Sequence, residues 1–404
     1  MEKKKKRILI FSLMYEPFVG GAEVAVRNIT DRLPDFLFDM VTLRLNRSLP
    51  RHEQVGNVRV HRIGFTGWGK RKESAKNTVV RFPLSLNKYL FPFLAVRYAK
   101  KLHRKNPYDA AWSIMANYAG FAAMFFKKKF PHVPFVLTLQ EGDPIAHILR
   151  RVRFVRGWFQ EIFDRADIIQ GISTFLIEVF AKKTMKYRGP TEVIPNGVDV
   201  ALFSQKVSQE ERQRGRAALG FSRDDILLIS TSRLVHKNAV DDVIRSLAFL
   251  PPQVKFLVVG AGPDEAFLRA LAQIQHVSER IVFIKSVDSA EVPRYLSIAD
   301  IFVRPSRSEG MGNSFIEAMA AGLPVIGTPV GGIIDFLKDG ETGLFCEVDK
   351  PESVAAQVKR LMEDKALREK ISANARAMVE EKYDWNIIAK QMKEKVFERM
   401  FTLL

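Results

Sequence analysis

The chain has 404 residues, of which 47% are hydrophobic, with one cysteine and a formal net charge of +18. A single core stops growing at roughly 250–300 residues, so this length favours two domains. One cysteine excludes an intramolecular disulfide and indicates a reducing, cytoplasmic setting. No run approaches the ~18 consecutive apolar residues that a membrane-spanning helix needs, so we expect a protein that is soluble or bound at a membrane surface.

The excess positive charge lies in the first half of the chain. Residues 1–195 hold 35 Lys and Arg against 16 Asp and Glu, whereas residues 196–404 hold 28 against 29. Two segments stand out: residues 70–105 carry 11 Lys and Arg with one acid, Glu73, and "RRVRFVRGW", residues 150–158, carries four arginines beside Phe154 and Trp158. Large apolar residues are interleaved in residues 70–105, namely Phe82, Tyr89, Leu90, Phe91, Phe93, Leu94 and Tyr98. This mixture favours an interfacial segment on anionic lipid; a nucleic-acid surface and a solvated basic face over a core remain as alternatives.

The N-terminus reads as a lysine-rich tail leading into a core strand, because its apolar run is short and lacks a small-residue cleavage site. Strand-like and helix-like segments then alternate. The expected strands of the first half are Arg7–Leu13, Asp39–Leu45, Val58–Ile63, Tyr108–Ile114, Phe135–Leu139, Asp167–Gly171 and Glu192–Ile194. Continuous apolar runs such as "RILIFSL" and "PFVLTL" fit strands buried on both faces, as in a parallel sheet. The pattern predicts a doubly wound α/β domain.

A glycine pair follows the first strand, in "PFVGGAEVAVRNITDRL". Gly20 and Gly21 precede a segment whose apolar residues recur at helical spacing, so a helix is expected to begin at the pair. Glycines there allow something to approach the backbone, and the N–H groups of a helix start suit an anion. The alternative is a simple tight strand-to-helix turn.

A Pro-Asn-Gly turn within Pro195–Asp199 marks the expected domain boundary. After it come a polar helix, Gln209–Leu219, and a second series of strands: "DDILLISTSRL", "VKFLVVGAG", "RIVFIKSV", "DIFVRPS", "LPVIGT" and "GLFCEV". We therefore expect domains at 1–195 and 196–384, with an amphipathic C-terminal helix, 385–404, packing back toward the first. Ligands of such sheets bind beyond the carboxyl ends of the strands, so both sets of strand ends are expected to line a cleft.

The most informative run is "RPSRSEGMGNSFIEAMAAGLPVIGTPVGG", residues 304–332. A strand ends in a glycine-bearing loop, and a helix begins near Gly312–Ser314, with Asn313 or Ser314 as the expected N-cap. This helix start offers N–H groups to a phosphate. Glu309 and Glu317, eight positions apart, flank the anion site and suit sugar or ribose hydroxyls.

This run resembles the signature of retaining glycosyltransferases of the GT-B fold, in particular glycosyltransferase family 4. The resemblance covers nearly the whole chain, in the order "GGAE", "PNGVD", "TSRLVHKNAVDDVI", "VVGAGPDE" and the E-x7-E block. It implies two Rossmann-like domains and an activated nucleotide sugar, held mainly by the second domain.

The resemblance also implies roles for individual residues. Glu317 is similar to the glutamate that binds the ribose hydroxyls, and Glu309 to the one that contacts the donor sugar. Arg233 and Lys237 match the cationic pair on the diphosphate. The backbone of the loop and helix start would hold the same diphosphate, and this set consists of Gly310, Met311, Gly312, Asn313, Ser314 and Phe315. Gly20 and Gly21 would face the reacting group from the first domain.

One loop departs from the family pattern. Where many relatives carry a histidine after the strand "FVLTL", this chain has Gln140, which cannot take a proton. Glu141 and Asp143 follow in the same loop. One of them is a candidate to orient acceptor or donor sugar, and an Asp-Pro turn without chemical role is the alternative.

Neither a metal nor a cofactor is expected to be needed. The departing nucleoside diphosphate gains negative charge, and Arg233, Lys237 and a helix end can stabilise it as preorganised donors. No convincing D-x-D pair or His/Cys cluster is present in the sequence.

The first domain is expected to choose the acceptor, and its charge favours a lipid-linked sugar or glycan at the inner, anionic face of the cell membrane. We therefore predict a cytoplasmic, peripheral membrane glycosyltransferase of surface polysaccharide or glycolipid synthesis. Two rivals are a non-hydrolysing nucleotide-sugar epimerase, which needs no acceptor, and a basic nucleic-acid-binding protein, which predicts steeply salt-dependent binding. Nucleic acid is not the expected partner, because paired glutamates in a glycine loop do not suit a surface that follows phosphates.

Overall fold

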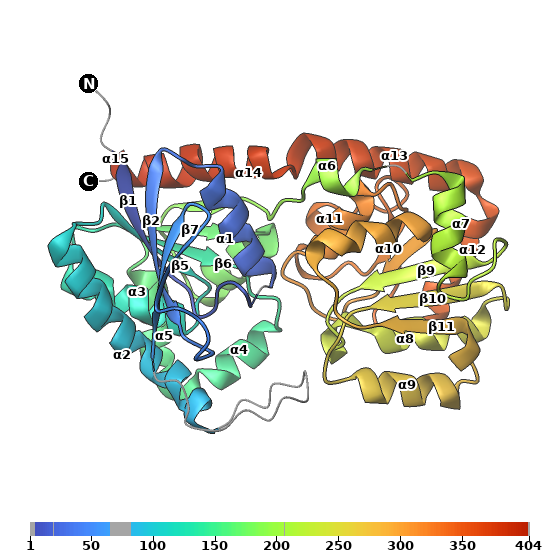
Figure 1. Cartoon of the computed structure of the whole chain (residues 1–404), viewed down its shortest axis with the longest axis horizontal. Coiled ribbons are helices and arrows are strands. Elements are labelled where there is room, and N and C mark those ends of the chain that lie inside the picture. The colour runs from blue at the N-terminus through green and yellow to red at the C-terminus, as the bar shows by residue number, and fades with distance from the viewer. Residues whose placement is uncertain (1–4, 19, 65–81, 206, 403–404) are drawn as a thin grey trace. The chain divides into compact units, whose positions relative to one another are not determined.

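The computed structural model describes residues 5–18, 20–64, 82–205 and 207–402, and side chains are described from residue 86 onward in the third of these stretches. The chain divides into two compact units (Figure 1). Unit 1 contains Met1–Glu141, Ile145–Asn196 and Trp385–Leu404, and unit 2 contains Gly142–Pro144 and Gly197–Asp384. Each unit is built around one sheet with helices on both faces.

The sheet of unit 1 has the strand order β3-β4-β2-β1-β5-β6-β7-β8. Its strands are β1 Lys6–Phe11, β2 Phe36–Leu43, β3 His52–Val55, β4 Val58–Ile63, β5 Ala110–Ile114, β6 Phe135–Leu139, β7 Ile168–Gly171 and β8 Thr191–Val193. All neighbours pair in parallel except β3, which is antiparallel to β4. The seven expected strands are confirmed, with ends shifted by up to three residues. The edge strand β3 was not predicted, because its polar sequence "HEQV" lacks the apolar run of a buried strand.

Alternate residues of β1 face two helical layers, as the pleat of a strand requires. Ile8 and Ile10 join a core with α1 (Gly21–Asp31) and the C-terminal helical segment. On the opposite face, the ring of Phe11 lies 5.8 Å from that of Phe126 in α3 (Tyr118–Lys129). The other helices of unit 1 are α2 Phe82–Lys105, α4 Ile145–Arg151, α5 Arg156–Asp164 and a π-type helix, Leu176–Thr184.

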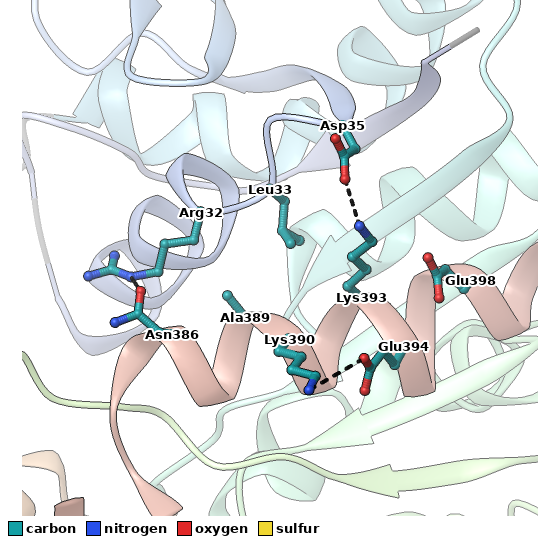
Figure 2. Close-up of a pocket in the computed structure, with 9 residues that line it drawn as sticks. All are labelled: Arg32, Leu33, Asp35, Asn386, Ala389, Lys390, Lys393, Glu394 and Glu398. Atoms are coloured by element: carbon teal, nitrogen blue, oxygen red, sulfur yellow. Dashed lines mark hydrogen bonds and ion pairs between the residues drawn. The ribbon is translucent and has the colours of Figure 1, made fainter. Parts of the chain in front are cut away.

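The C-terminal segment is a nearly continuous helix, formed by α14 Trp385–Gln391, a π-type turn Met392–Glu398 and α15 Arg399–Thr402. Its apolar side buries Trp385, Val396 and Phe397 in the core of unit 1. Figure 2 shows a pocket where this segment meets the end of α1; there Arg32 Nε donates to Asn386 at 3.0 Å and Lys393 pairs with Asp35 at 2.6 Å. Lys393 and Lys390 of this pocket pair with Asp35 and Glu394, so we regard the pocket as a packing junction.

The sheet of unit 2 is fully parallel, with the order β11-β10-β9-β12-β13-β14. Its strands are β9 Ile226–Thr231, β10 Val254–Val259, β11 Ile281–Ile284, β12 Ile301–Arg304, β13 Val325–Gly327 and β14 Leu344–Phe345. In chain order this is 3-2-1-4-5-6, the arrangement of a dinucleotide-binding Rossmann sheet. The strand order reverses between β9 and β12, and ligands of such sheets bind beyond the strand ends at this switch point.

Helices cover both faces of this sheet. One layer packs α8 (Val240–Ser246), α9 (Glu265–Ile274) and α12 (Pro351–Glu363) on strand residues such as Phe256 and Val303. On the other face, Phe315 of α11 (Asn313–Ala320) lies edge-on to Phe302 of β12 at 5.1 Å. The remaining helices are α6 Val200–Phe203, α7 Gln209–Ala217, α10 Val292–Ile298 and α13 Lys365–Lys382.

Candidate active site

The charged residues expected at the site follow the two strands that flank the switch point of unit 2. Arg233 and Lys237 follow β9, and Glu309 lies in the loop between β12 and α11. The two segments are tied directly: the backbone N–H of Arg307 donates to Lys237 O at 2.8 Å. Parallel topology therefore brings residues more than 70 positions apart in sequence to one edge of the sheet.

Lys237 and Glu309 converge on one point, marked by Gly142. A Cβ atom added at Gly142 would lie 2.8 Å from Lys237 Nζ, 3.4 Å from Glu309 Oε1 and 3.4 Å from the Gly310 nitrogen. Asp143, next in the chain, pairs with Lys237 at 3.4 Å, and Ser308 Oγ donates to Gly142 O at 3.2 Å. An ammonium, a carboxylate and a glycine-rich backbone thus meet at the carboxyl end of the sheet of unit 2.

Arg304 is a buried member of the site that sequence reasoning missed. It ends β12, and its guanidinium donates to Ser306 Oγ at 3.1 Å, to Ser314 Oγ at 2.6 Å and to the Glu309 carboxylate. The same group lies 4.9 Å from the centre of the Phe315 ring. One arginine therefore connects the strand end, the loop carboxylate and the first turn of α11. The sequence feature that could have revealed this role is an arginine at the end of the apolar run "IFVR".

The start of α11 differs from the expected cap. Gly312 is the N-cap, with φ of +103°, and the prediction of Asn313 or Ser314 there was wrong. A residue with a side chain rarely adopts this conformation, and a Cβ at Gly312 would lie 2.9 Å from the Phe315 ring. Ser314 instead binds Arg304, and the Phe315 N–H donates to Gly312 O at 3.0 Å. The Phe315 N–H is therefore already hydrogen-bonded within the loop. The backbone N–H groups expected to bind a diphosphate are then those of the residues before Phe315.

Glu317 lies one turn into α11. Burial raises the pKa of its carboxyl to about 7, and the nearby charge of Arg304 opposes this shift. Without a ligand, this carboxyl is therefore protonated more readily than an exposed glutamate. Hydroxyl donors placed beside it would favour the ionised form, as ribose hydroxyls would.

Arg233 is held at the switch point by glycine-rich backbone. A Cβ at Gly260, in the "VVGAGPDE" motif, would lie 1.9 Å from Ser232 O, so only glycine allows this approach. The Leu234 N–H donates to Ala261 O at 3.1 Å. Arg233 itself is exposed, and its guanidinium makes no ion pair within the part of the chain that the structure describes.

Arg307 is a second positioning cation that the sequence did not reveal. Its guanidinium donates to His236 O at 2.7 Å and pairs with Asp241 at 2.8 Å and Asp242 at 3.1 Å. The segment that carries Lys237 is thereby fastened to the loop that carries Glu309. Asp241 and Asp242, the aspartates of "AVDDVI", therefore hold Arg307 in place and, through it, the two loops at this edge of the sheet.

The glycine pair of unit 1 begins a helix, as expected. Gly20 is the N-cap of α1 and Gly21 its first residue. The Gly20 N–H donates to Glu23 Oε2 at 2.9 Å, so the glutamate of "GGAE" closes a capping interaction. Burial raises the pKa of Glu23.

The polar loop after β6 divides between the two units. Glu141 is buried in unit 1, where its carboxylate accepts the Ala116 N–H at 2.6 Å and the Gln140 N–H at 2.9 Å. The Gln140 side chain accepts from Asn196 Nδ2 at 3.3 Å. Glu141 therefore anchors strand ends through its carboxylate, whereas Asp143 belongs with Lys237 in unit 2.

The described residues offer neither a metal-binding cluster nor a membrane-spanning helix. Within them, no group of three or more His, Cys, Asp or Glu side chains is arranged to hold a metal ion. None of the helices in these residues combines the length and apolarity needed to cross a bilayer.

A Rossmann sheet whose switch point carries two cations, a glycine-rich loop and a helix start can bind a diphosphate, with carboxylates for hydroxyl groups beside it. The comparisons agree. Residues 19–202 match the model described as Glycosyltransferase Family 4, and residues 211–378 match Glycosyl transferases group 1. A structure of sucrose-phosphate synthase from Thermosynechococcus elongatus superposes with a TM-score of 0.82 at 22% identity, covering 99% of this chain and 100% of that one. The fold is GT-B, the architecture of a large class of glycosyltransferases. Within that class, the chain is family 4-like, with one matched range in each half of its sequence.

Three curated relatives illustrate the range of the family. An uncharacterized glycosyltransferase of Methanocaldococcus jannaschii is 31% identical over 50% of this chain and 52% of its own. A GDP-mannose-dependent monoacylated alpha-(1-6)-phosphatidylinositol monomannoside mannosyltransferase of Corynebacterium glutamicum is 29% identical over 59% of this chain and 64% of its own. The alpha-monoglucosyldiacylglycerol synthase of Acholeplasma laidlawii is 25% identical over 91% of both chains. The chain thus spans about half to two thirds of the length of the first two.

Proposed function

We propose that this protein is a retaining glycosyltransferase that moves a sugar from a nucleotide-diphosphate donor to a lipid-linked or glycan acceptor. The observation that carries the proposal is the convergence of Lys237 Nζ and the Glu309 carboxylate at the glycine-rich loop before α11. This combination suits a ligand that carries an anionic group beside hydroxyl groups, as a nucleotide sugar does.

In this proposal each group has a distinct task. Cleavage of the glycosyl–phosphate bond gives the sugar oxocarbenium character and leaves negative charge on the nucleoside diphosphate. Arg233, Lys237 and the backbone before α11 stabilise that charge, so no metal is needed, and one preorganised donor contributes roughly 3–4 kcal/mol. Glu309 contacts the sugar and Glu317 the ribose hydroxyls. Retention of anomeric configuration rests on family membership.

The acceptor is proposed from the relatives and from charge. Two of the relatives are named for lipid-linked sugars, a phosphatidylinositol monomannoside and a monoglucosyldiacylglycerol. The excess of Lys and Arg in the first half of this chain suits an anionic lipid surface. We therefore place the enzyme in surface polysaccharide or glycolipid synthesis, acting at the cytoplasmic face of the membrane.

The test is a thermal-shift and calorimetric panel of UDP, GDP, ADP and their common sugars without metal. Wild type, Glu317→Ala and a surface control, Glu279→Ala, are compared; Glu279 is exposed in unit 2. We expect one nucleoside diphosphate to stabilise wild type and the control selectively, and the Glu317 variant to lose the response. If no nucleotide stabilises wild type, the proposal is wrong. Conversion of the donor sugar without any acceptor would instead indicate an epimerase.

A further inference from the structure

A group of large apolar side chains is exposed on one side of unit 1. Their relative exposures lie between 37% and 85%, and they come from α2, from a 3-10 helix at Arg153–Val155 and from α5: Leu86, Tyr89, Leu90, Phe93, Phe154, Val155 and Trp158. Together with Phe125 of α3 we call them the aromatic face. Phe91, which lies in the same basic segment, is fully buried and does not belong to this face.

The aromatic face is continuous across three helices. The ring of Phe93 stacks on Phe125 at 5.4 Å, and Phe125 in turn lies edge-on to Trp158 at 5.8 Å. A second pair, Tyr89 and Tyr118, is 5.5 Å apart. Because α3 packs against both α2 and α5 (Figure 1), the exposed rings of residues 86–93 and of residues 154–158 border one surface.

Cations border these rings without carboxylate partners. Lys88 Nζ lies 5.1 Å from the centre of the Tyr89 ring, and the Arg153 guanidinium lies 4.5 Å from that of Phe154. Lys88, Arg153 and Arg156 form no ion pair with any described residue. Neither residues 82–105 nor residues 145–160 contain an Asp or Glu. The segments that carry the exposed rings are therefore both apolar and positively charged, and the nearest acid along α5, Glu161, pairs with Lys128.

We propose that the aromatic face docks on the surface of an anionic phospholipid bilayer. Exposed rings enter the boundary between headgroups and acyl chains, while Lys88, Arg153 and Arg156 pair with lipid phosphates. A second copy of this chain is a poorer occupant, because two such faces would place like charges opposite one another. The inference rests on the proposed function, in which the acceptor is linked to a lipid.

The experiment measures sedimentation of the full chain with vesicles of phosphatidylcholine containing about 30% phosphatidylglycerol, and with phosphatidylcholine alone. The variants are F154S/W158S on the aromatic face and R153Q/R156Q beside it. The matched control is F267S/I274S, which removes two side chains of 53% and 69% exposure from α9 in unit 2. Each protein is also assayed for its melting temperature, its nucleotide response and its oligomeric state.

We expect wild type and F267S/I274S to bind anionic vesicles alike, and F154S/W158S to bind at least about tenfold more weakly. R153Q/R156Q should lose its preference for anionic lipid, and it carries the test if F154S/W158S does not fold. Equal binding by all folded variants overturns the inference. So does a wild-type dimer that F154S/W158S converts to monomer without vesicle binding. The nucleotide response is measured separately. If wild type shows none, the proposed function fails, whatever the result with vesicles.

Discussion

The central strands of the two sheets follow the same parallel order, but the two units use the switch point differently. In both sheets, the strand order reverses beside the first strand, between β1 and β5 in unit 1 and between β9 and β12 in unit 2. At this edge of unit 1, Ser12 donates to Met14 O, Ser113 donates to Met115 O, and Glu141 binds two backbone N–H groups. At the edge of unit 2, Lys237 and Glu309 instead lie beside a glycine-rich loop.

The distribution of charge sharpens this contrast. Unit 1 holds 39 Lys and Arg against 17 Asp and Glu, and unit 2 holds 24 against 28. The unit whose charge is nearly balanced carries the expected anion site, whereas the excess cations of unit 1 include those beside exposed aromatic rings on α2 and just before α5. A large positive net charge therefore suits binding to an extended anionic surface of a partner. A diphosphate site, by contrast, depends on a few cations held in a fixed place.

The largest effect is expected from Arg304, because it connects three parts of the edge in unit 2. Arg304→Met leaves the Glu309 carboxylate without its cation and Ser314 without its donor. We expect the free energy of unfolding to fall by about 3 kcal/mol, and the nucleotide response to be lost. Denaturant unfolding measures the first and thermal shift the second. Arg294→Met, at an exposed position of α10, should change neither. If Arg304→Met is as stable as wild type, Arg304 does not hold this edge together.

Lys237 tests whether the two switch points differ in chemistry. Lys237→Ala removes a charge-assisted contact to the proposed diphosphate, so the affinity for the nucleoside diphosphate should fall roughly 10- to 100-fold. The affinity for the nucleoside alone should stay unchanged. Lys285→Ala, an exposed lysine of unit 2, serves as the control. Isothermal titration of the nucleoside and its diphosphate gives both values, and an equal loss for the two ligands would contradict a diphosphate role.

Much of this contrast could be predicted from the sequence, and some could not. Apolar runs predicted the parallel strands, because strands buried on both faces need continuous apolar sequence. The E-x7-E block predicted where the loop and helix lie. Arg304 was missed because an arginine at a strand end is read as exposed, and its burial depends on Glu309, Ser306 and Ser314 together. Glu141 was treated as a chemical candidate because nothing in its neighbours predicts that Ala116, 25 positions earlier, supplies a backbone N–H.

Gly312 is expected to be sensitive where a glycine of unit 1 is not. Gly312→Ala forces a φ of +103° on a residue with a side chain and brings its Cβ toward Phe315. This should lower the free energy of unfolding by about 1–2 kcal/mol. Gly157→Ala in α5 meets nothing within 4 Å and should change stability by less than about 0.5 kcal/mol. Chemical denaturation of both variants measures the difference, and equal values would show that the α11 loop tolerates rearrangement.

The smallest effect concerns Glu317, and its sign depends on pH. Burial raises the pKa of this carboxyl from 4.5 to about 7, so between these values the folded state keeps a proton that the unfolded chain has released. Stability contributed by the protonated form is therefore lost as pH rises through this range. Glu317→Gln cannot ionise, so its melting temperature should exceed that of wild type by a margin that grows from pH 5 to pH 8, by about 2 °C. Glu279→Gln should show no such growth. Scanning calorimetry at both pH values measures the margins, and a constant margin would mean that Glu317 stays ionised. A bound nucleotide should reverse the order at pH 8, because its ribose hydroxyls donate to the carboxylate that only wild type provides.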